Sequence, residues 1–143
     1  MAGCHNGARE MERDEQGLNA MEVKRMQVWF ADLGTHDGKC LQEGERPVLI
    51  ISNDRANEHC PAVTVIPMTS KIKKLHLRSH IVIGEHNIKK ATDRPFREAL
   101  LLLEQITTID KRSLITYVGK VNSPAAEMSI GLAIKAQLGM EGI

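Results

Sequence analysis

The sequence predicts a small, mainly antiparallel β barrel or sheet with one helix at its C-terminal end. Two observations support this fold class. Short apolar runs rich in β-branched residues recur along the chain with turn-forming residues between them, and a helical pattern follows the last run. The length of 143 residues suits one domain with a hydrophobic core of its own.

The apolar runs are short enough to be strands and are separated by polar, glycine-bearing segments. We expect strands at residues 27–33, 47–51, 62–70, 80–84, within 98–106 and at 116–121. Pro67 favours an edge or a bulge for the third of these, because proline cannot donate a hydrogen bond to a neighbouring strand. The leucine run within 98–106 is equally typical of a buried helix. Residues 85–97 are polar and are predicted to form a loop.

The last segment is predicted to be a helix. Ser123 suits the N-cap position and Pro124 the first helical position. One apolar stripe has helical spacing, and a second row lies roughly opposite. The stripe consists of Ile130, Ala133, Ile134 and Leu138, and the second row consists of Met128, Leu132 and Ala136. A helix that is apolar on two sides usually packs on its own sheet with one side and on another surface with the other.

Composition narrows the class of protein further. Residues 1–23 are polar and of mixed charge, so we expect a disordered extension before a domain at 24–143. The net charge of +1 gives no global field typical of nucleic-acid binders. No signal peptide or membrane span is recognisable, so we expect a cytoplasmic protein. Neither the three cysteines nor the six histidines have the spacing of a metal site, and no metal or other cofactor is expected.

One segment has a local excess of positive charge. No acidic residue lies between Cys60 and Gly84, where the cations are Lys71, Lys73, Lys74 and Arg78. Such a strip fits contact with RNA or DNA phosphates, and it also fits a solvated loop. Aromatic residues make up only 3% of the chain, which argues against a binder that stacks bases on an aromatic platform.

Arg46 is the most informative single residue. It precedes Pro47 at the start of a buried strand and follows a polar, glycine-bearing segment. No phosphate-binding loop, nucleophile elbow or carboxylate pair is recognisable, so an enzyme built from this chain would have to use few groups. RNA allows this, because its 2′-hydroxyl is an internal nucleophile. Arg46 would clamp phosphate oxygens, and Thr69 or Ser70 would donate a further hydrogen bond. The competing interpretation is a salt bridge at a strand end.

Four strings then occur in order and at characteristic spacing: VWFADL, RPVLIISND, MTSKIKK and LLLEQITTIDKRSL. With them the chain resembles the MazF/PemK (Kid-like) toxin endoribonucleases, from about Lys24 to Leu138. The resemblance implies an SH3-like antiparallel β barrel with a C-terminal helix, and a homodimer. It also implies metal-independent cleavage of single-stranded RNA at short sequences, leaving a 2′,3′-cyclic phosphate and a 5′-hydroxyl. The implied partners are an antitoxin, whose disordered tail folds across the toxin, and operator DNA through the antitoxin complex.

The resemblance also implies site residues. The catalytic pair of the family matches Arg46 and Thr69. The RNA-binding residues come from the loop before Arg46, the segment after Thr69 and the end of the leucine run. They are Gln42, Glu43, Ser70, Lys71, Lys73, Glu104 and Gln105.

Some positions depart from the family pattern. Met26-Gln27 stands where Gly-Asp is common, the loop differs around Gly38–Cys40, and Thr107 replaces a frequent arginine. Two alternative functions therefore stay open. One is a CcdB-like toxin that binds a protein target through its C-terminal helix without catalysis. The other is an inactive paralogue that acts with an antitoxin in DNA-bound autoregulation.

Overall fold

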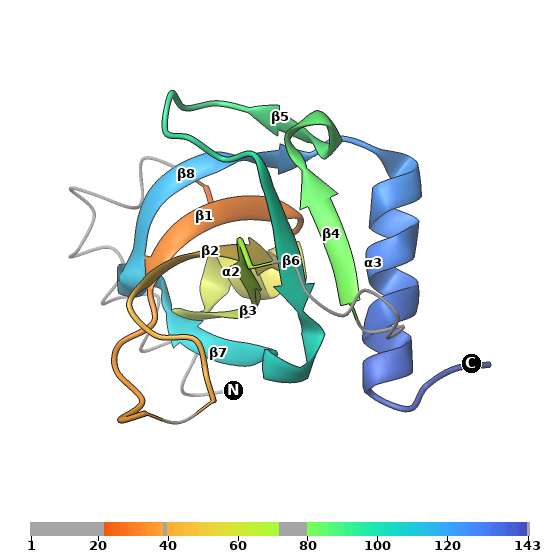
Figure 1. Ribbon diagram of the computed structural model, residues 1–143, viewed down its shortest axis with the longest axis horizontal. Coiled ribbons are helices and arrows are strands. Elements are labelled where there is room, and N and C mark those ends of the chain that lie inside the picture. The colour runs from red at the N-terminus through yellow and green to blue at the C-terminus, as the bar shows by residue number, and fades with distance from the viewer. Residues whose placement is uncertain (1–21, 39, 72–79, 143) are drawn as a thin grey trace.

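The computed structural model describes residues 22–38, 40–71 and 80–142 (Figure 1). Strands dominate the described chain, with short helical turns between them and one long helix after the last strand. The strands are β1 (Gln27–Asp32), β2 (Glu45–Ile50), β3 (Ala62–Thr69), β4 (His80–Gly84), β5 (Ile88–Lys90), β6 (Glu98–Leu102), β7 (Thr107–Asp110) and β8 (Leu114–Val121). The helices are α2 (Asp54–His59), α3 (Pro124–Gln137) and the 3₁₀ turns η2 (Glu85–Asn87), η3 (Leu103–Gln105) and η4 (Lys111–Ser113).

The strands form one antiparallel, nearly closed barrel. Their order is β4-β6-β3-β2-β1-β8-β5, and β7 pairs with β3 beside β6. Figure 1 shows β1 and β8 curving around one side and α3 standing beside β4 on the other. The predicted class, an antiparallel barrel with a C-terminal helix, is confirmed.

The prediction of a loop at 85–97 was wrong, and the strand that follows the leucine run was not predicted. The stretch 85–97 contains β5, which pairs with β8 through Ile88 opposite Val121. Three residues are too few to show an alternating pattern, so this strand has no sequence signal. The leucine run is strand β6 followed by η3, and not a buried helix. Strand β7 was not predicted, because its pairing with β3 decides it rather than its own composition.

The prediction of an edge strand or bulge at Pro67 was also wrong. β3 lies inside the sheet, with β2 on one side and both β7 and β6 on the other. On that second side, β7 pairs with residues 62–65 and β6 with residues 68–69. Pro67 falls in the gap between them. Neither β7 nor β6 pairs with Pro67 on this side. The backbone N–H that proline lacks is therefore not needed for a hydrogen bond to either strand.

Successive side chains of β1 point into two different cores. Val28 packs in the larger cluster with Leu49, Ile66 and Leu101, and the partly buried Phe30 lies against it. Trp29 and Ala31 lie in the second cluster, which contains Val48, Ile50, Val63 and Val65. Both faces of the strand are thus covered. Val23, which the prediction placed in the extension, is also buried in the second cluster.

Met26, where the resemblance implies glycine, has a backbone conformation that glycine adopts without strain. Its φ of 72° lies in the left-handed region, which costs a residue with a side chain about 1–2 kcal/mol. The Met26 side chain is only 3% exposed and packs in the larger core. Full burial of a methionine side chain contributes about 1.5–3 kcal/mol. Burial therefore offsets the backbone cost at this departure from the family pattern.

Helix α3 covers the larger core with one side. Ser123 caps it by accepting a hydrogen bond from the Ala126 amide, as predicted. Ile130 and Ala133 are buried, whereas Met128 and Leu132 are 70% and 61% exposed. Leu138 was predicted to share the buried stripe, but the helix ends at Gln137 and Leu138 is exposed. The chain turns directly afterwards through Gly139, whose φ is 69°.

Candidate active site

Arg46 is held by its backbone and has a free side chain. It is the second residue of β2 and lies opposite Ala31 of β1, and the next pair is Pro47 with Phe30. The strand then continues into the buried residues Val48, Leu49 and Ile50, which anchor it. The Arg46 side chain is exposed, and the residues that the structure describes include no ion-pair partner for it. The alternative of a strand-end salt bridge does not apply to Arg46 within this part of the chain.

The arginine faces a cleft of about 490 Å³. One side of this Arg46 cleft comes from the start of β2 and the end of β3, and the other from the segment that leads into β6. The lining residues are Phe30, Gln42, Glu45, Arg46, Pro47, Met68, Thr69, Ser70, Lys71, Pro95, Phe96, Arg97, Glu98 and Ala99. Five predicted site residues thus meet in one place, namely Arg46, Thr69, Gln42, Ser70 and Lys71.

Thr69 is the last residue of β3, where it pairs with Leu100 of β6. Its side-chain oxygen accepts a hydrogen bond of 3.2 Å from the Lys71 amide. This bond uses the oxygen as an acceptor, so the hydroxyl proton is available to donate. Thr69 is half-buried, whereas Ser70 and Lys71 are exposed. The end of β3 therefore offers a hydroxyl donor and a cation at the mouth of the cleft.

A second cleft, of about 310 Å³, lies on the other side of Gln42. Glu104 and Gln105 line it together with β7 residues such as Thr107 and Thr108. The Gln105 side chain accepts a 2.8 Å hydrogen bond from the Gln42 amide and donates a 3.2 Å bond to the Cys40 carbonyl. Both ends of this amide hold the loop between β1 and β2. We call this the Gln105 cleft.

The remaining predicted RNA-binding residues lie elsewhere. Glu43 lines neither cleft, and its carboxylate accepts a 2.8 Å bond from the His36 amide within the same loop. Lys73, with Lys74 and Arg78 of the basic strip, lies outside the described residues. The predicted set therefore separates into a group around Arg46, a group around Gln105 and a loop residue, with Gln42 shared by both clefts.

Sequence reasoning missed the 94–98 wall, in which residues 95–98 line the Arg46 cleft and Arg94 holds them in place. Arg94 lies over the Phe30 ring, 3.5 Å from its centre, and donates a 3.3 Å bond to the Thr116 hydroxyl. Arg94 also forms an ion pair with Glu45, the neighbour of Arg46. These contacts fix the segment against β1, β2 and β8. The available signal was the second Arg-Pro pair of the chain, at 94–95, followed by Phe96 and the charged pair Arg97-Glu98.

A buried lysine and a neighbouring exposed ion pair lie away from the clefts. Lys111 is only 3% exposed, and its ammonium donates a hydrogen bond to the Asn57 carbonyl near the end of α2. Burial lowers the pKa of Lys111 below its ordinary value of 10.5. Asp110 beside it accepts side-chain hydrogen bonds from Arg112, which lower the pKa of that carboxyl. The Lys111 bond joins α2 to the turn that follows β7.

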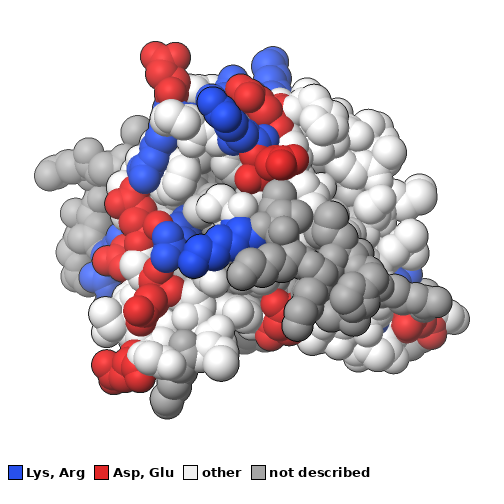
Figure 2. Space-filling view, in the orientation of Figure 1, with Lys and Arg blue, Asp and Glu red and all other residues white. Residues whose placement is uncertain are grey.

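Charged side chains of both signs lie around the cleft face of the molecule, whereas the surface over α3 is mostly uncharged (Figure 2). Among residues 22–38, 40–71 and 80–142, no three His, Cys, Asp or Glu side chains gather as metal ligands would. Within the same residues, no helix is long and apolar enough to cross a membrane.

Comparisons with known proteins agree with this geometry. A relative from Staphylococcus saprophyticus, described as endoribonuclease MazF, is 36% identical over 118 residues, which are 77% of this chain and 92% of the relative. A mycobacterial endoribonuclease solved in complex with its cognate antitoxin has a TM-score of 0.65 and 26% identity, and the match covers 85% of this chain and 99% of that one.

A third comparison supports the fold alone. The structure of MazF from Deinococcus radiodurans has a TM-score of 0.66 at 17% identity, over 84% of this chain and 99% of that one. The family match itself spans residues 24–129, which include every described strand of the barrel and part of α3. The chain therefore belongs to the PemK-like, MazF-like toxins of type II toxin–antitoxin systems.

Proposed function

We propose that this chain is a sequence-specific endoribonuclease that cleaves single-stranded RNA without a metal ion, with Arg46 and Thr69 as its catalytic pair. The observation that carries the proposal is the meeting of both residues in one cleft, where Arg46 has no ion-pair partner among the described residues. The 36% identity to a protein described as endoribonuclease MazF supports the same activity.

The chemistry requires little from the protein. The 2′-oxygen of RNA attacks the adjacent phosphorus and displaces the 5′-oxygen of the next nucleotide, which leaves a 2′,3′-cyclic phosphate and a 5′-hydroxyl. Negative charge grows on the phosphate oxygens during this step. The Arg46 guanidinium can bind two of these oxygens at once, and the Thr69 hydroxyl can donate to another. Lys71 and Ser70 at the cleft mouth would hold neighbouring phosphates.

The test is cleavage of a mixed-sequence single-stranded RNA in EDTA by the wild type and by Arg46→Ala. Loss of one donor to a developing oxyanion costs about 10²–10³ in rate, so the variant should be nearly inactive. Arg55→Ala is the matched control, because Arg55 is an exposed arginine on α2 that lines neither cleft. If folded wild type leaves the RNA intact, the nuclease proposal is wrong and a CcdB-like binding toxin or an inactive paralogue replaces it.

The proposal includes two protein partners. One is a cognate antitoxin, supported by family membership and by the mycobacterial endoribonuclease solved with its antitoxin. Its predicted disordered tail would fold along the clefts and exclude RNA. Operator DNA would be bound through that complex. With RNA as the substrate, the site of action would be the cytoplasm.

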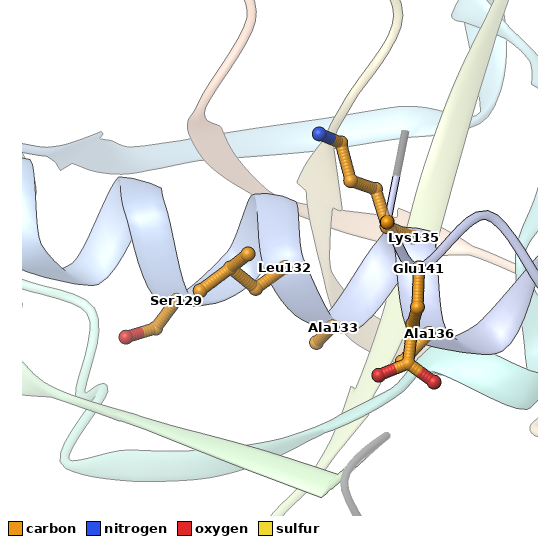
Figure 3. Close-up of a pocket in the computed structure, with 7 residues that line it drawn as sticks. Ser129, Leu132, Ala133, Lys135, Ala136 and Glu141 are labelled. Carbon is orange, nitrogen blue, oxygen red and sulfur yellow. The ribbon is translucent and has the colours of Figure 1, made fainter.

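The other partner is a second copy of the chain. The outward side of α3 exposes Met128 and Leu132, and Leu138 and Met140 follow at its end. Figure 3 shows Ser129 and Leu132 projecting from α3, with Glu141 of the following turn beside Ala136. This mostly uncharged surface is a candidate dimer interface. Sedimentation of the wild type and of Leu132→Glu would test it, and a monomeric variant is the expected result.

A further inference from the structure

The proposed reaction needs a group that takes the proton from the 2′-hydroxyl. Arg46 and Lys71 are cations and have no free electron pair to accept it at neutral pH. Thr69 is a hydroxyl and is not basic. Histidine is the commonest general base, but the described residues that line the Arg46 cleft include no histidine. Carboxylates come next, and two described ones line the cleft, those of Glu45 and Glu98. The question is which of the two is available.

Glu45 is occupied. Its carboxylate forms an ion pair with Arg94, and Arg94 is itself held over Phe30 and bonded to Thr116. Taking up a proton would weaken this ion pair and loosen the 94–98 wall. Glu45 therefore has a structural partner that competes with a role in proton transfer.

Glu98 is placed differently. It is the first residue of β6, it is exposed, and it lies opposite Gly84 of β4. On the other side of β6, Thr69 pairs with Leu100, so the antiparallel direction brings Glu98 to the end of the sheet where β3 runs out into Ser70 and Lys71. Within the described residues, its carboxylate has no ion-pair or hydrogen-bond partner. Among the described residues, it is thus the carboxylate of the cleft without a partner.

We propose that Glu98 is the general base of this enzyme, an inference that rests on the proposed ribonuclease function. The Glu98 carboxylate takes the proton of the 2′-hydroxyl as the 2′-oxygen forms its bond to phosphorus. The bond from phosphorus to the 5′-oxygen breaks, and the leaving oxygen takes a proton from solvent water. Glu98 returns its own proton to solvent before the next turnover, so no further reactant is needed.

The described charged groups around Glu98 are mostly cations without a partner in the described chain. Arg97 precedes Glu98 in the chain, Arg46 faces the same cleft from β2, and Lys71 enters it from the end of β3. Arg94 is neutralised by Glu45, and Glu85, which follows β4, is paired with Lys90. The described groups around Glu98 therefore have a positive balance, which suits a cleft that receives an RNA phosphate.

The experiment compares the wild type with Glu98→Gln, Glu98→Asp and Glu45→Gln in single-turnover cleavage at saturating enzyme across pH 4–8. General-base catalysis contributes about 10²–10⁴ in rate, so Glu98→Gln should lose that much. It should also lose the rise in rate that accompanies ionisation of the base at low pH. Glu98→Asp should keep that rise with a partial loss of rate. Glu45→Gln should lose less than about tenfold and keep the rise.

Two further measurements separate catalysis from folding and binding. Each variant is melted to show that it is folded, and each is titrated with an RNA that carries 2′-deoxyribose at the cleavage position. Glu98→Gln should bind this uncleavable RNA as tightly as the wild type. If the wild type cleaves and folded Glu98→Gln cleaves within threefold of it with the same pH dependence, the assignment of Glu98 is wrong while the nuclease function stands. If the wild type itself does not cleave, both the assignment of Glu98 and the proposed nuclease function are wrong.

Discussion

The two clefts on either side of Gln42 differ in whether their polar side chains have partners within the protein. In the Arg46 cleft, Arg46 and Glu98 have no ion-pair partner among the described residues. In the Gln105 cleft, both ends of the Gln105 amide are bonded to the backbone of the β1–β2 loop. Free polar groups can form new bonds with a substrate, whereas bonded ones maintain the shape of the protein. We therefore expect chemistry in the first cleft and loop support in the second.

Arg46→Lys is expected to give the largest loss of cleavage rate, and it tests the role of the unpaired arginine in the Arg46 cleft. Lysine keeps the charge but cannot bind two phosphate oxygens with a planar fork, so the cleavage rate should fall about 100-fold. The melting temperature should stay within about 1 °C, because the side chain is exposed and has no described partner. Single-turnover cleavage and thermal melting measure the two quantities. A variant that cleaves as fast as the wild type would show that charge alone is sufficient.

A smaller loss of activity is expected for Thr69→Val. The change removes the hydroxyl donor and keeps the shape, which should cost about tenfold to 100-fold in rate, or about 1–3 kcal/mol. Thr108→Val is the control, because Thr108 is an exposed threonine of the Gln105 cleft. The same cleavage assay applies. Equal losses in both variants would contradict the division between the clefts.

Gln105→Ala should affect stability and binding more than chemistry. Two hydrogen bonds to the loop are lost, at about 0.5–1.5 kcal/mol each, so the free energy of unfolding should fall by about 1–3 kcal/mol. KM should rise about tenfold as the loop loosens, and kcat should stay within threefold. Urea denaturation and steady-state kinetics provide these values. Thr107→Ala, an exposed change in the same cleft, should alter stability by less than about 0.5 kcal/mol.

The smallest effect is expected at Lys111, at the end of the strand that lines the Gln105 cleft. The pKa of Lys111 is lowered in the folded protein by burial, so the unfolded chain binds more protons between that lowered pKa and 10.5. The free energy of unfolding should therefore rise with pH in this window. Urea denaturation from pH 8.5 to 10 should show the rise in the wild type and not in Lys111→Met.

Tyr117 limits the pH range of this measurement. Burial raises the pKa of Tyr117 above 10.0, so the unfolded chain loses this proton first and stability falls above pH 10. Both proteins contain Tyr117, and the difference between them isolates Lys111. A rise of the same size in Lys111→Met would mean that another group is responsible.

The sequence by itself determined the fold class and the catalytic candidates Arg46 and Thr69. Strand patterns and the capped helix are local features, since side-chain alternation and N-caps depend on a few neighbouring residues. Arg46 before Pro47 and Thr69 at the end of an apolar run were readable for the same reason. The family strings then tied the two positions together before any pairing of strands was known.

Only the tertiary structure decided which residues share a cleft. The wall at 94–98 meets Arg46 because β6 pairs with β3 and because Arg94 folds over Phe30, contacts between segments far apart in the chain. Gln105 was placed among the RNA-binding residues, yet its amide reaches the loop 63 residues away. β5 and β7 likewise depend on their partner strands. Such pairings are set by burial and hydrogen bonding across the whole barrel, which a local pattern does not contain.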